Sequence, residues 1–463
     1  MKPVLLLDVV GLTSAGIGER TPELAALARR GACAPMSSVL PAVTCSAQAT
    51  LLTGRMPAQH GAVGNGWFAR EYGEVALWRQ SNALVAGEKL YEAARRRWSS
   101  FTAAKLFWWW NLGAAVEWSI TPRPFYPADG RKIPAVYSAP GEYGARLERE
   151  LGPFPFFDFW GPKSGLPSSR WIAEATLRTL REERPTLTLA YLPHLDYDLQ
   201  RFGPRHPRSQ TALSEVDALV GALVRGADEL GVETVVVSEY GLVEVARPVH
   251  VNRALREAGL LAARPTPAGE VLDVFASRAF ALADHQLAHV YVRDERALAA
   301  SRECLGALPG VARLLDRAAQ REFGLDHERS GDLVALSERD AWFTYYYWSD
   351  PAAEPDFART VDIHRKPGYD PCELFLDPEL ALPKLHVARR LAQKKLGMRY
   401  LMDVIPLDAA LVKGSHGLLP ERPEDGPVFL SSRAWSDCGG EPANGVVAMT
   451  SVKERVLALL ERS

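Results

Sequence analysis

Residues 211–241 read TALSEVDALVGALVRGADELGVETVVVSEYG and place a helical pattern directly before a strand. Residues 211–231 repeat apolar side chains at helical spacing and end in glycine, whereas residues 234–241 begin with an uninterrupted apolar run. Another apolar strand, TLTLAYLP at 186–193, precedes this helix, and a helical pattern at 168–183 precedes that strand. Strands that alternate with helices predict an α/β fold with a doubly wound, mostly parallel sheet flanked by helices.

The same alternation occurs near the N-terminus. We predict a strand at 4–10 and helices at 21–31 and 46–54, each helix ending in glycine. Two regions depart from this alternation of strands and helices. Residues 106–165 are rich in aromatic residues, Pro and Gly and predict a cap inserted over one end of the sheet, and residues 266–360 predict an insertion with short strands. The core then comprises residues 1–105, 166–265 and 361–463.

Composition restricts the class of partner. Of the 463 residues, 47% are hydrophobic and 24% are charged, which is typical of a globular protein. The 54 Lys and Arg residues nearly balance the 56 Asp and Glu residues, for a net charge of −2, so we expect neither a nucleic acid polymer nor a membrane as partner. No apolar run reaches the roughly 18 residues of a membrane span.

Other compositional features predict a location. The N-terminal apolar run is interrupted by Asp8 and lacks a cleavage site, so we interpret it as a strand and not as a signal peptide. The five cysteines form no CxxC pair, and their number is odd, which favours a reducing compartment and therefore the cytoplasm. No sequence pattern predicts an oligomeric state.

Oxygen-bearing side chains follow several predicted strands. Asp8 ends the first strand, Asp196 follows TLTLAYLPHL, Glu239 follows TVVVS, and Thr44 precedes the helix at 46–54. Ligands collect at the carboxyl ends of strands in such sheets, and these side chains are suited to hold a divalent cation beside a nucleophile. Taken alone, VVVSEYG equally fits a buried strand that ends at a surface loop, and Thr44 is more typical of a helix N-cap.

The motifs around these residues resemble those of a known family. The segments LLLDVVG (5–11) and PAVTCSAQATLLTGRMPAQHGAVGN (41–65) are similar in order and spacing to the nucleotide pyrophosphatase/phosphodiesterase branch of the alkaline phosphatase superfamily. The resemblance implies an alkaline phosphatase-like core, with Asp8 as a metal ligand, Thr44 as a metal-bound nucleophile and Asn65 as a contact of the phosphoryl group. A helix N-terminus beside Thr44 suits an incoming phosphate.

The later motifs of the family are partly altered. The resemblance implies metal ligands at Asp196 and at His416 in GSHG (414–417), but its next histidine is Gln200 here, and its Asp-His pair is Glu239-Tyr240. An oxygen-rich set suits manganese, magnesium or iron better than two tightly held zinc ions, so we expect one or two divalent ions, zinc included. Tyr240 either ligates as a phenolate or donates a hydrogen bond to the substrate.

Replacement ligands are sought among the histidines that follow Glu239. His250, His285, His289 and His364 are each more typical of a structural histidine, yet VDIHRKPGYDP (361–371) is dense in charge, so we predict His364 as a metal ligand. Weaker patterns suggest substrate contacts; these are Gln200, His250, Lys366 and, in the aromatic region, Arg123.

The predicted function is metal-dependent hydrolysis of a phosphodiester or pyrophosphate bond in a small phosphorylated metabolite, through a phosphothreonine on Thr44. Two alternatives remain open. One is a non-catalytic phospholigand-binding descendant with a depleted metal site. The other is a hydrolase of phosphomonoesters, phosphonates or sulfate esters on the same fold.

Overall fold

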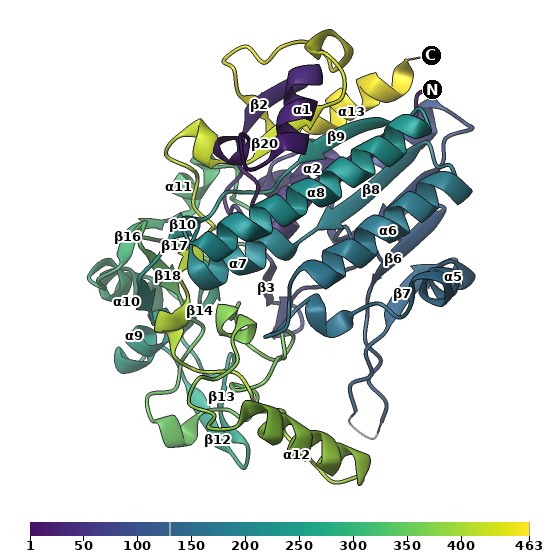
Figure 1. Cartoon of the computed structure of the whole chain (residues 1–463). Coiled ribbons are helices and arrows are strands. Elements are labelled where there is room, and N and C mark those ends of the chain that lie inside the picture. The colour runs from purple at the N-terminus through teal and green to yellow at the C-terminus, as the bar shows by residue number, and fades with distance from the viewer. Residues whose placement is uncertain (129–130, 463) are drawn as a thin grey trace.

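The computed structural model describes residues 1–128 and 131–462, and its centre is a nine-stranded sheet (Figure 1). In spatial order the strands are β21 (Val447–Ala448), β2 (Ala32–Ser37), β20 (Val428–Ser431), β9 (Glu233–Val237), β1 (Val4–Val9), β8 (Leu187–Leu192), β5 (Ala103–Leu106), β6 (Trp118–Pro122) and β7 (Val136–Ala139). The neighbours from β9 to β6 pair in parallel, and β20 and β7 run antiparallel to theirs. The predicted mostly parallel α/β sheet is therefore confirmed.

Helices cover both faces of this sheet. One face packs against α1 (Pro22–Arg30), α5 (Gly141–Leu151), α6 (Leu166–Glu182) and α8 (Pro207–Glu229). The other packs against α2 (Thr44–Thr53), α4 (Leu90–Arg97) and α13 (Val452–Glu461). Strand β1 shows why both faces are needed: Leu5 and Leu7 enter the first core, and Val4 and Leu6 enter the second. A strand buried on both sides is apolar at nearly every position.

The aromatic region at 106–165 differs from the predicted cap. Its residues supply β6 and β7, which extend the central sheet, and α5 packs beside β7. Within the triplet Trp108–Trp110, the first and third rings are buried in the core and only Trp109 lines a cavity. The cap was predicted because the region is rich in aromatic residues, Pro and Gly and lacks strand periodicity. The structure instead packs many of these aromatic side chains into the cores of the central sheet.

Residues 266–360 contain a second sheet with its own hydrophobic core. The order is β14 (Ala279–Asp284), β15 (Leu287–Val292), β17 (Leu333–Ser337) and β16 (Val311–Leu315), all antiparallel. Helices α9 (Val251–Glu257), α10 (Glu295–Gly306) and α11 (Arg317–Glu322) lie beside it. Four strand pairs complete the sheets: β3 (Gly66–Ala69) with β4 (Glu74–Leu77), β10 (Val243–Glu244) with β19 (Gly414–Ser415), β11 (Arg247–Val249) with β18 (Ala341–Phe343), and β12 (Ala263–Thr266) with β13 (Gly269–Leu272).

The remaining helices are α3 (Pro57–His60), α7 (His194–Phe202) and α12 (Pro383–Lys395). Over the described ranges, no helix combines the length and apolarity that a bilayer crossing requires.

Candidate functional site

The carboxyl ends of β1, β8 and β9 meet at a cavity of about 1110 Å³. Asp196 lies in the first turn of α7, directly after β8, and Glu239 follows β9 by two residues. Thr44 is the first residue of α2, with Val43 as the N-cap, so its hydroxyl is not used as a helix cap. The cavity wall includes Thr44, Asp196, Gln200, Tyr240 and His416.

Thr44 is hydrogen-bonded to a buried carboxylate. Its Oγ1 donates to Glu239 Oε2 at 2.7 Å and lies 3.3 Å from the hydroxyl oxygen of Tyr240. Because Thr44 has one hydroxyl hydrogen and Glu239 takes it, Tyr240 is the donor in the second contact. Burial, then the charges of Asp196 and Glu239, raise the pKa of Tyr240 well above its usual value, which favours the protonated phenol.

Gln48 joins the two carboxylates of this half of the site. Its Nε2 donates to Asp8 Oδ2 at 3.0 Å and to Glu239 Oε1 at 2.7 Å, and its Oε1 accepts the backbone N–H of Trp109 at 2.6 Å. Since that N–H donates only to oxygen, the orientation of the amide is fixed. Burial raises the pKa of both carboxyl groups, and the charge of Glu239 raises that of Asp8 further. Asp8 therefore holds a proton more readily, and Glu239 carries the charge beside Thr44.

A second amide, that of Gln200, is hydrogen-bonded to Asp196. Gln200 donates from Nε2 to Asp196 Oδ2 at 2.6 Å, and its Oε1 accepts the hydroxyl hydrogen of Tyr369 at 2.8 Å. Burial raises the pKa of Asp196 to about 7. Asp196 Oδ1 is buried without a hydrogen-bond partner, as is Nε2 of His416, whose pKa is lowered by burial to about 3. The Nδ1 of His416 donates to the Ala42 carbonyl at 2.7 Å, so its Nε2, like Asp196 Oδ1, keeps a free lone pair; Asp8 Oδ1 is likewise buried without a partner.

Four rings form a stack along the cavity. The ring centroids of Tyr240 and His416 are 3.6 Å apart, those of His416 and His285 are 3.6 Å apart, and those of His285 and Tyr369 are 3.7 Å apart. His285 is the first residue of the two-residue hairpin between β14 and β15, and its φ is +61°. Glycine is usual at that hairpin position, and a side chain there costs on the order of 1 kcal/mol. Neighbouring contacts hold the hairpin tip in place: the backbone N–H of Gln286 donates to the His416 carbonyl at 2.9 Å.

Asn65 is held by the same hairpin. Asp284 accepts the backbone N–H of Asn65 at 2.8 Å and its side-chain Nδ2 at 3.0 Å, while Asn65 Oδ1 accepts the N–H of Cys45 at 3.1 Å. Asn65 is thus placed beside the start of α2, next to Thr44, but its side chain is engaged within the protein and does not line the cavity. Its contact with a phosphoryl group stays a prediction.

The other predicted residues are more widely distributed. His364 lines the cavity, with Nδ1 3.3 Å from the Leu77 carbonyl, and Arg123 lies at the rim. Lys366 is buried in an ion triad, with Nζ 2.7 Å from both Asp370 and Glu373, and does not reach the cavity. His250 also lies outside the cavity, where its Nδ1 is 2.7 Å from the hydroxyl oxygen of Thr344.

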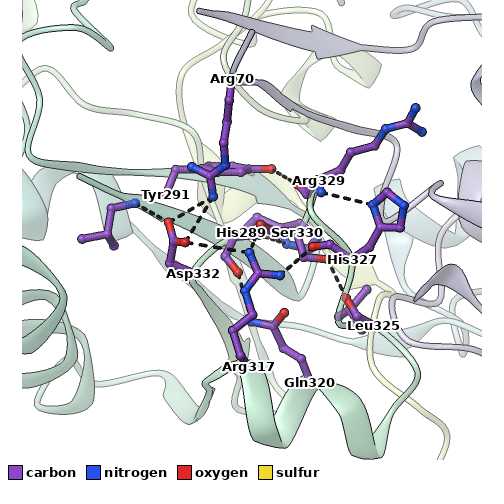
Figure 2. Close-up of polar contacts among 12 residues, drawn as sticks. Arg70, His289, Tyr291, Arg317, Gln320, Leu325, His327, Arg329, Ser330 and Asp332 are labelled. Carbon is purple, nitrogen blue, oxygen red and sulfur yellow. Dashed lines mark hydrogen bonds and ion pairs between the residues drawn. The ribbon is translucent and has the colours of Figure 1, made fainter. Parts of the chain in front are cut away.

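Figure 2 shows the polar contacts of the loop between α11 and β17, from which Arg329 lines the cavity. Arg317 donates to the carbonyls of His327 and Ser330 and so shapes this loop. From the loop, Arg329 Nη1 donates to the carbonyls of Gly61 and Leu84 at 2.9 and 2.7 Å, and its guanidinium lies 4.5 Å above the Trp67 ring. Two loops of the second sheet therefore contribute to the cavity wall, through Arg329 and through His285.

The donor set fits a cation in one half of the site only. In the described part of the chain, no three His, Cys, Asp or Glu side chains converge as a metal site. Between Asp8 and Glu239, the N–H groups of Gln48 point at the carboxylates and Thr44 takes Glu239 Oε2, which leaves Asp8 Oδ1 as the one unpaired oxygen; this half therefore does not fit a cation as it is arranged. Asp196 Oδ1 and His416 Nε2 are free, and a carboxylate with a neutral imidazole fits a catalytic ion that keeps open positions.

Three residues that complete the site, Gln48, Asp284 and Tyr369, were not placed there by sequence reasoning, whereas His285 was considered as a replacement ligand. Gln48 lies one helical turn after Thr44, and this spacing on an entirely buried helix was the available signal. Asp284, His285 and Tyr369 come from distant segments, and only the fold brings them to Thr44.

This arrangement places a buried hydroxyl and carboxylate pair at the carboxyl edge of a doubly wound sheet, where α/β proteins hold their ligands. The particular family follows from comparison with known proteins: the sequence profile of type I phosphodiesterase / nucleotide pyrophosphatase matches residues 4–370, and the chain belongs to that family. The predicted relationship, and with it the class of phosphoric ester hydrolases, is confirmed. The GSHG motif with His416 lies beyond the matched range.

Individual relatives are distant. An uncharacterized pyrophosphatase/phosphodiesterase of Schizosaccharomyces pombe is 24% identical over 227 residues, which are 48% of this chain and 41% of the yeast protein. Phosphonoacetate hydrolase of Sinorhizobium meliloti has a TM-score of 0.61 at 16% identity, covering 99% of this chain and 96% of its own. Murine ectonucleotide pyrophosphatase/phosphodiesterase 5 has a TM-score of 0.58 at 14% identity, covering 100% and 96%. At these identities, the structural likeness shows the shared fold.

Proposed function

We propose that the protein hydrolyses a phosphodiester or pyrophosphate bond of a small phosphorylated metabolite through a phosphothreonine on Thr44. The observation that carries this proposal is the 2.7 Å hydrogen bond from Thr44 Oγ1 to Glu239 Oε2 at the floor of the cavity. A hydroxyl is a weak nucleophile at neutral pH and needs a partner that removes its proton. Glu239 is that partner.

The chemical steps follow from these atoms. Thr44 Oγ1 attacks phosphorus in line with the leaving oxygen, so the Oγ–P bond forms as the bond from phosphorus to the leaving group breaks. The proton of Thr44 passes to Glu239 Oε2, while the Tyr240 hydroxyl, 3.3 Å from Oγ1, donates to the developing negative charge. The leaving oxygen departs with the proton that Glu239 took up. Water then gives a proton to Glu239 as its oxygen bonds to phosphorus and the Oγ–P bond breaks, and Glu239 returns that proton to Thr44. The N-terminus of α2 faces the phosphoryl group with its positive dipole end.

Asp196 and His416 are the residues that would hold a divalent ion, through Oδ1 and Nε2. Such an ion supplies Lewis-acid stabilisation of charge on the phosphoryl oxygens when bound. Manganese, magnesium, iron and zinc remain candidates, because a carboxylate and an imidazole suit all four. In the half of the site with Asp8 and Glu239, the Gln48 amide donates to Glu239 Oε1. This hydrogen bond orients the carboxylate so that its other oxygen, Oε2, faces Thr44.

The cavity wall suggests a substrate that carries a ring and a second charged group. Trp78, Trp109 and Tyr369 line it on one side, with Arg79 and Arg123 nearby. An inactive threonine-to-alanine variant of the murine ectonucleotide enzyme has been solved with AMP, and the bacterial neighbour with phosphonoacetate. Both ligands are small and carry a phosphorus group, in keeping with this proposal.

His285 adds a substrate contact within the proposed mechanism. Its ring is 2% exposed, lines the cavity and has no hydrogen bond among the described residues. Burial lowers its pKa well below the usual value, so the ring is neutral and offers one N–H donor. We infer that this N–H contacts an oxygen of the bound ester.

The five cysteines are free, which supports the predicted cytoplasmic location.

The test is a substrate panel with bis-p-nitrophenyl phosphate, a monoester, a sulfate ester and a phosphonate, assayed with each of the four metals. We expect turnover of the diester that Thr44→Ala abolishes and Thr44→Ser partly keeps, and a phosphorylated Thr44 after acid quench by mass spectrometry. Preferred cleavage of the monoester, sulfate or phosphonate reassigns the substrate class. Binding of these compounds without turnover indicates the non-catalytic alternative.

A further inference from the structure

Helix α12 projects from the lower edge of the molecule, and none of its residues is buried (Figure 1). The side that faces the protein is fixed by two residues one turn apart. His386 Nε2 lies 2.8 Å from Asp403 Oδ1, and Arg390 pairs with both oxygens of the same carboxylate at 2.8 and 2.6 Å. The opposite side of the helix therefore faces solvent.

The solvent-facing side carries an apolar stripe. Leu385, Ala388, Ala392 and Leu396 recur at intervals of three and four residues, which places them along one line of the helix, with Leu396 just past its end. Leu385 is 63% exposed and Leu396 is 75% exposed. Further exposed apolar side chains flank the stripe in the same segment: Leu382, Leu391, Met398 and Leu401. Such a concentration of exposed apolar surface marks an interaction site.

The charge of this segment is of one sign. Residues 382–401, LPKLHVARRLAQKKLGMRYL, contain six Lys and Arg residues and no Asp or Glu. Of these six cations, only Arg390 has an ion pair with a described residue, the one with Asp403. Arg389 borders the stripe on one side, and Lys384 and Lys395 border it on the other. The near-neutral charge of the whole chain conceals this local cluster.

We propose that α12 docks on the surface of an anionic lipid bilayer, with the stripe of Leu385, Ala388, Ala392 and Leu396 in the acyl boundary and the flanking cations on the lipid headgroups. A cationic amphipathic helix with modest overall hydrophobicity lies in the membrane plane in this way. Long Lys side chains keep their charged ends at the headgroups while their stems follow the apolar surface.

The charge distribution favours a bilayer over a protein partner. A protein interface concentrates its energy in aromatic anchors, whereas this segment has Tyr400 as its single aromatic residue. Leucine between cations matches a surface that is anionic outside and apolar beneath. This proposal departs from the expectation of no membrane partner, which rested on the net charge of −2.

Docking would act on the part of the molecule that contains the cavity. The segment around α12 is attached to Arg359, whose carbonyl accepts the Val404 N–H at 3.0 Å and whose side chain reaches Asp377 at 3.4 Å. Val361 and Ile363, just beyond Arg359 in the chain, line the cavity. A bound bilayer would therefore lie next to one wall of the site.

The test is flotation of the full chain with vesicles of phosphatidylcholine alone and with vesicles that also contain phosphatidylserine. We expect binding to the anionic vesicles only, weakening as salt shortens the Debye length. Lys384→Gln/Lys395→Gln, which removes two exposed cations beside the stripe, should lower the partition coefficient roughly 30-fold, since each cation near such a surface contributes roughly a factor of five. Leu385→Gln/Leu396→Gln, which leaves the charge unchanged, should lower it roughly tenfold or more.

The control, Arg20→Gln/Leu419→Gln, removes one exposed cation and one exposed leucine outside α12 and should bind as the wild type does. All variants should keep the wild-type melting temperature, because the changed side chains are exposed. Failure of the wild type to bind anionic vesicles overturns the proposal, as does binding that the leucine pair does not change. Self-association of the wild type that the leucine pair disperses assigns the stripe to a second copy and also overturns it. Flotation needs no turnover, so it is independent of the proposed hydrolysis.

Discussion

Glu239→Gln separates base catalysis from a structural role of Glu239, because the structure dictates how the new amide must lie. Gln48 is fixed by the N–H of Trp109, and its Nε2 points at Glu239 Oε1 at 2.7 Å. A glutamine at 239 must turn its oxygen toward Gln48. Its NH2 group then faces Thr44 Oγ1, where it donates a hydrogen bond and accepts no proton.

The expected loss is that of a general base. Such groups contribute about 10²- to 10⁴-fold in rate, equivalent to about 2.7–5.4 kcal/mol of transition-state stabilisation. The fold should be unharmed, because the change removes a buried charge next to Asp8 and keeps the shape of the side chain. We expect kcat/KM for bis-p-nitrophenyl phosphate to fall by that factor at pH 7, with a melting temperature equal to or above the wild-type value.

The matched control is Glu338→Gln, an exposed carboxylate paired with Arg247 outside the cavity, which should leave both quantities unchanged. A Glu239→Gln protein that keeps kcat/KM within tenfold of the wild type refutes the assignment of Glu239 as the base. Loss of activity together with a collapsed melting temperature would instead give Glu239 a structural role.

Four further predictions concern the neighbourhood of Thr44. His285→Phe keeps the ring stack and loses the N–H, so kcat/KM should fall roughly 10- to 100-fold with an unchanged melting temperature; His285→Asn keeps an N–H and should be more active but less stable, and the reverse order contradicts the proposed contact. Elemental analysis should find at most one tightly bound divalent ion per chain, kept in Asp8→Asn and lost in Asp196→Asn; two ions, or one that depends on Asp8, would show that Gln48 does not exclude a cation. Burial raises the pKa of Asp284 from 3.8 to about 6, so its contribution to stability is full below pH 3.8 and is lost as pH rises through 6. By denaturant unfolding, Asp284→Asn should gain about 2.5 kcal/mol relative to the wild type between pH 4 and pH 7, and a constant difference would contradict the shift. Lys366→Met leaves Asp370 and Glu373 without their cation and should cost about 3–5 kcal/mol of unfolding free energy with KM unchanged; a raised KM at unchanged stability would restore Lys366 as a substrate contact.

The central sheet could be predicted from the sequence because its strands are buried on both faces. The predicted strand at 186–193 is β8 at 187–192, and the predicted strand at 4–10 is β1 at 4–9. The predicted strand at 234–241 ends earlier, at Val237, because the hydroxyl of Ser238 accepts the N–H of Val428 at 2.9 Å in place of a backbone carbonyl and donates to the Leu12 carbonyl at 2.6 Å. Strands β6 and β7 were missed because both lie near the sheet edge, where the apolar pattern is weak.

The residues of the site also fall into those that the sequence could place and those that it could not. Asp8, Thr44, Asp196 and Glu239 lie at strand ends or helix starts, so their proximity follows from the topology of the sheet. The hairpin that brings Asp284 and His285 to Asn65 and His416 lies more than 200 residues after Thr44. Neither its length nor its composition indicates where its tip lies, so no sequence pattern could place it.

The departures from the family pattern are coupled through contacts and are best understood as one unit. Gln200 reaches Asp196 with an N–H because the Tyr369 hydroxyl occupies its oxygen, and the Tyr369 ring stacks on His285. His285 stacks on His416, which in turn stacks on Tyr240. Independent decay of ligands would leave buried polar groups without partners, at a cost of about 1–3 kcal/mol each. Here each replacement is hydrogen-bonded or stacked by the next. Restoring one histidine, as in Gln200→His, would therefore remove the partner of Tyr369 without rebuilding a second metal site, and we expect that variant to lose stability and gain no ion.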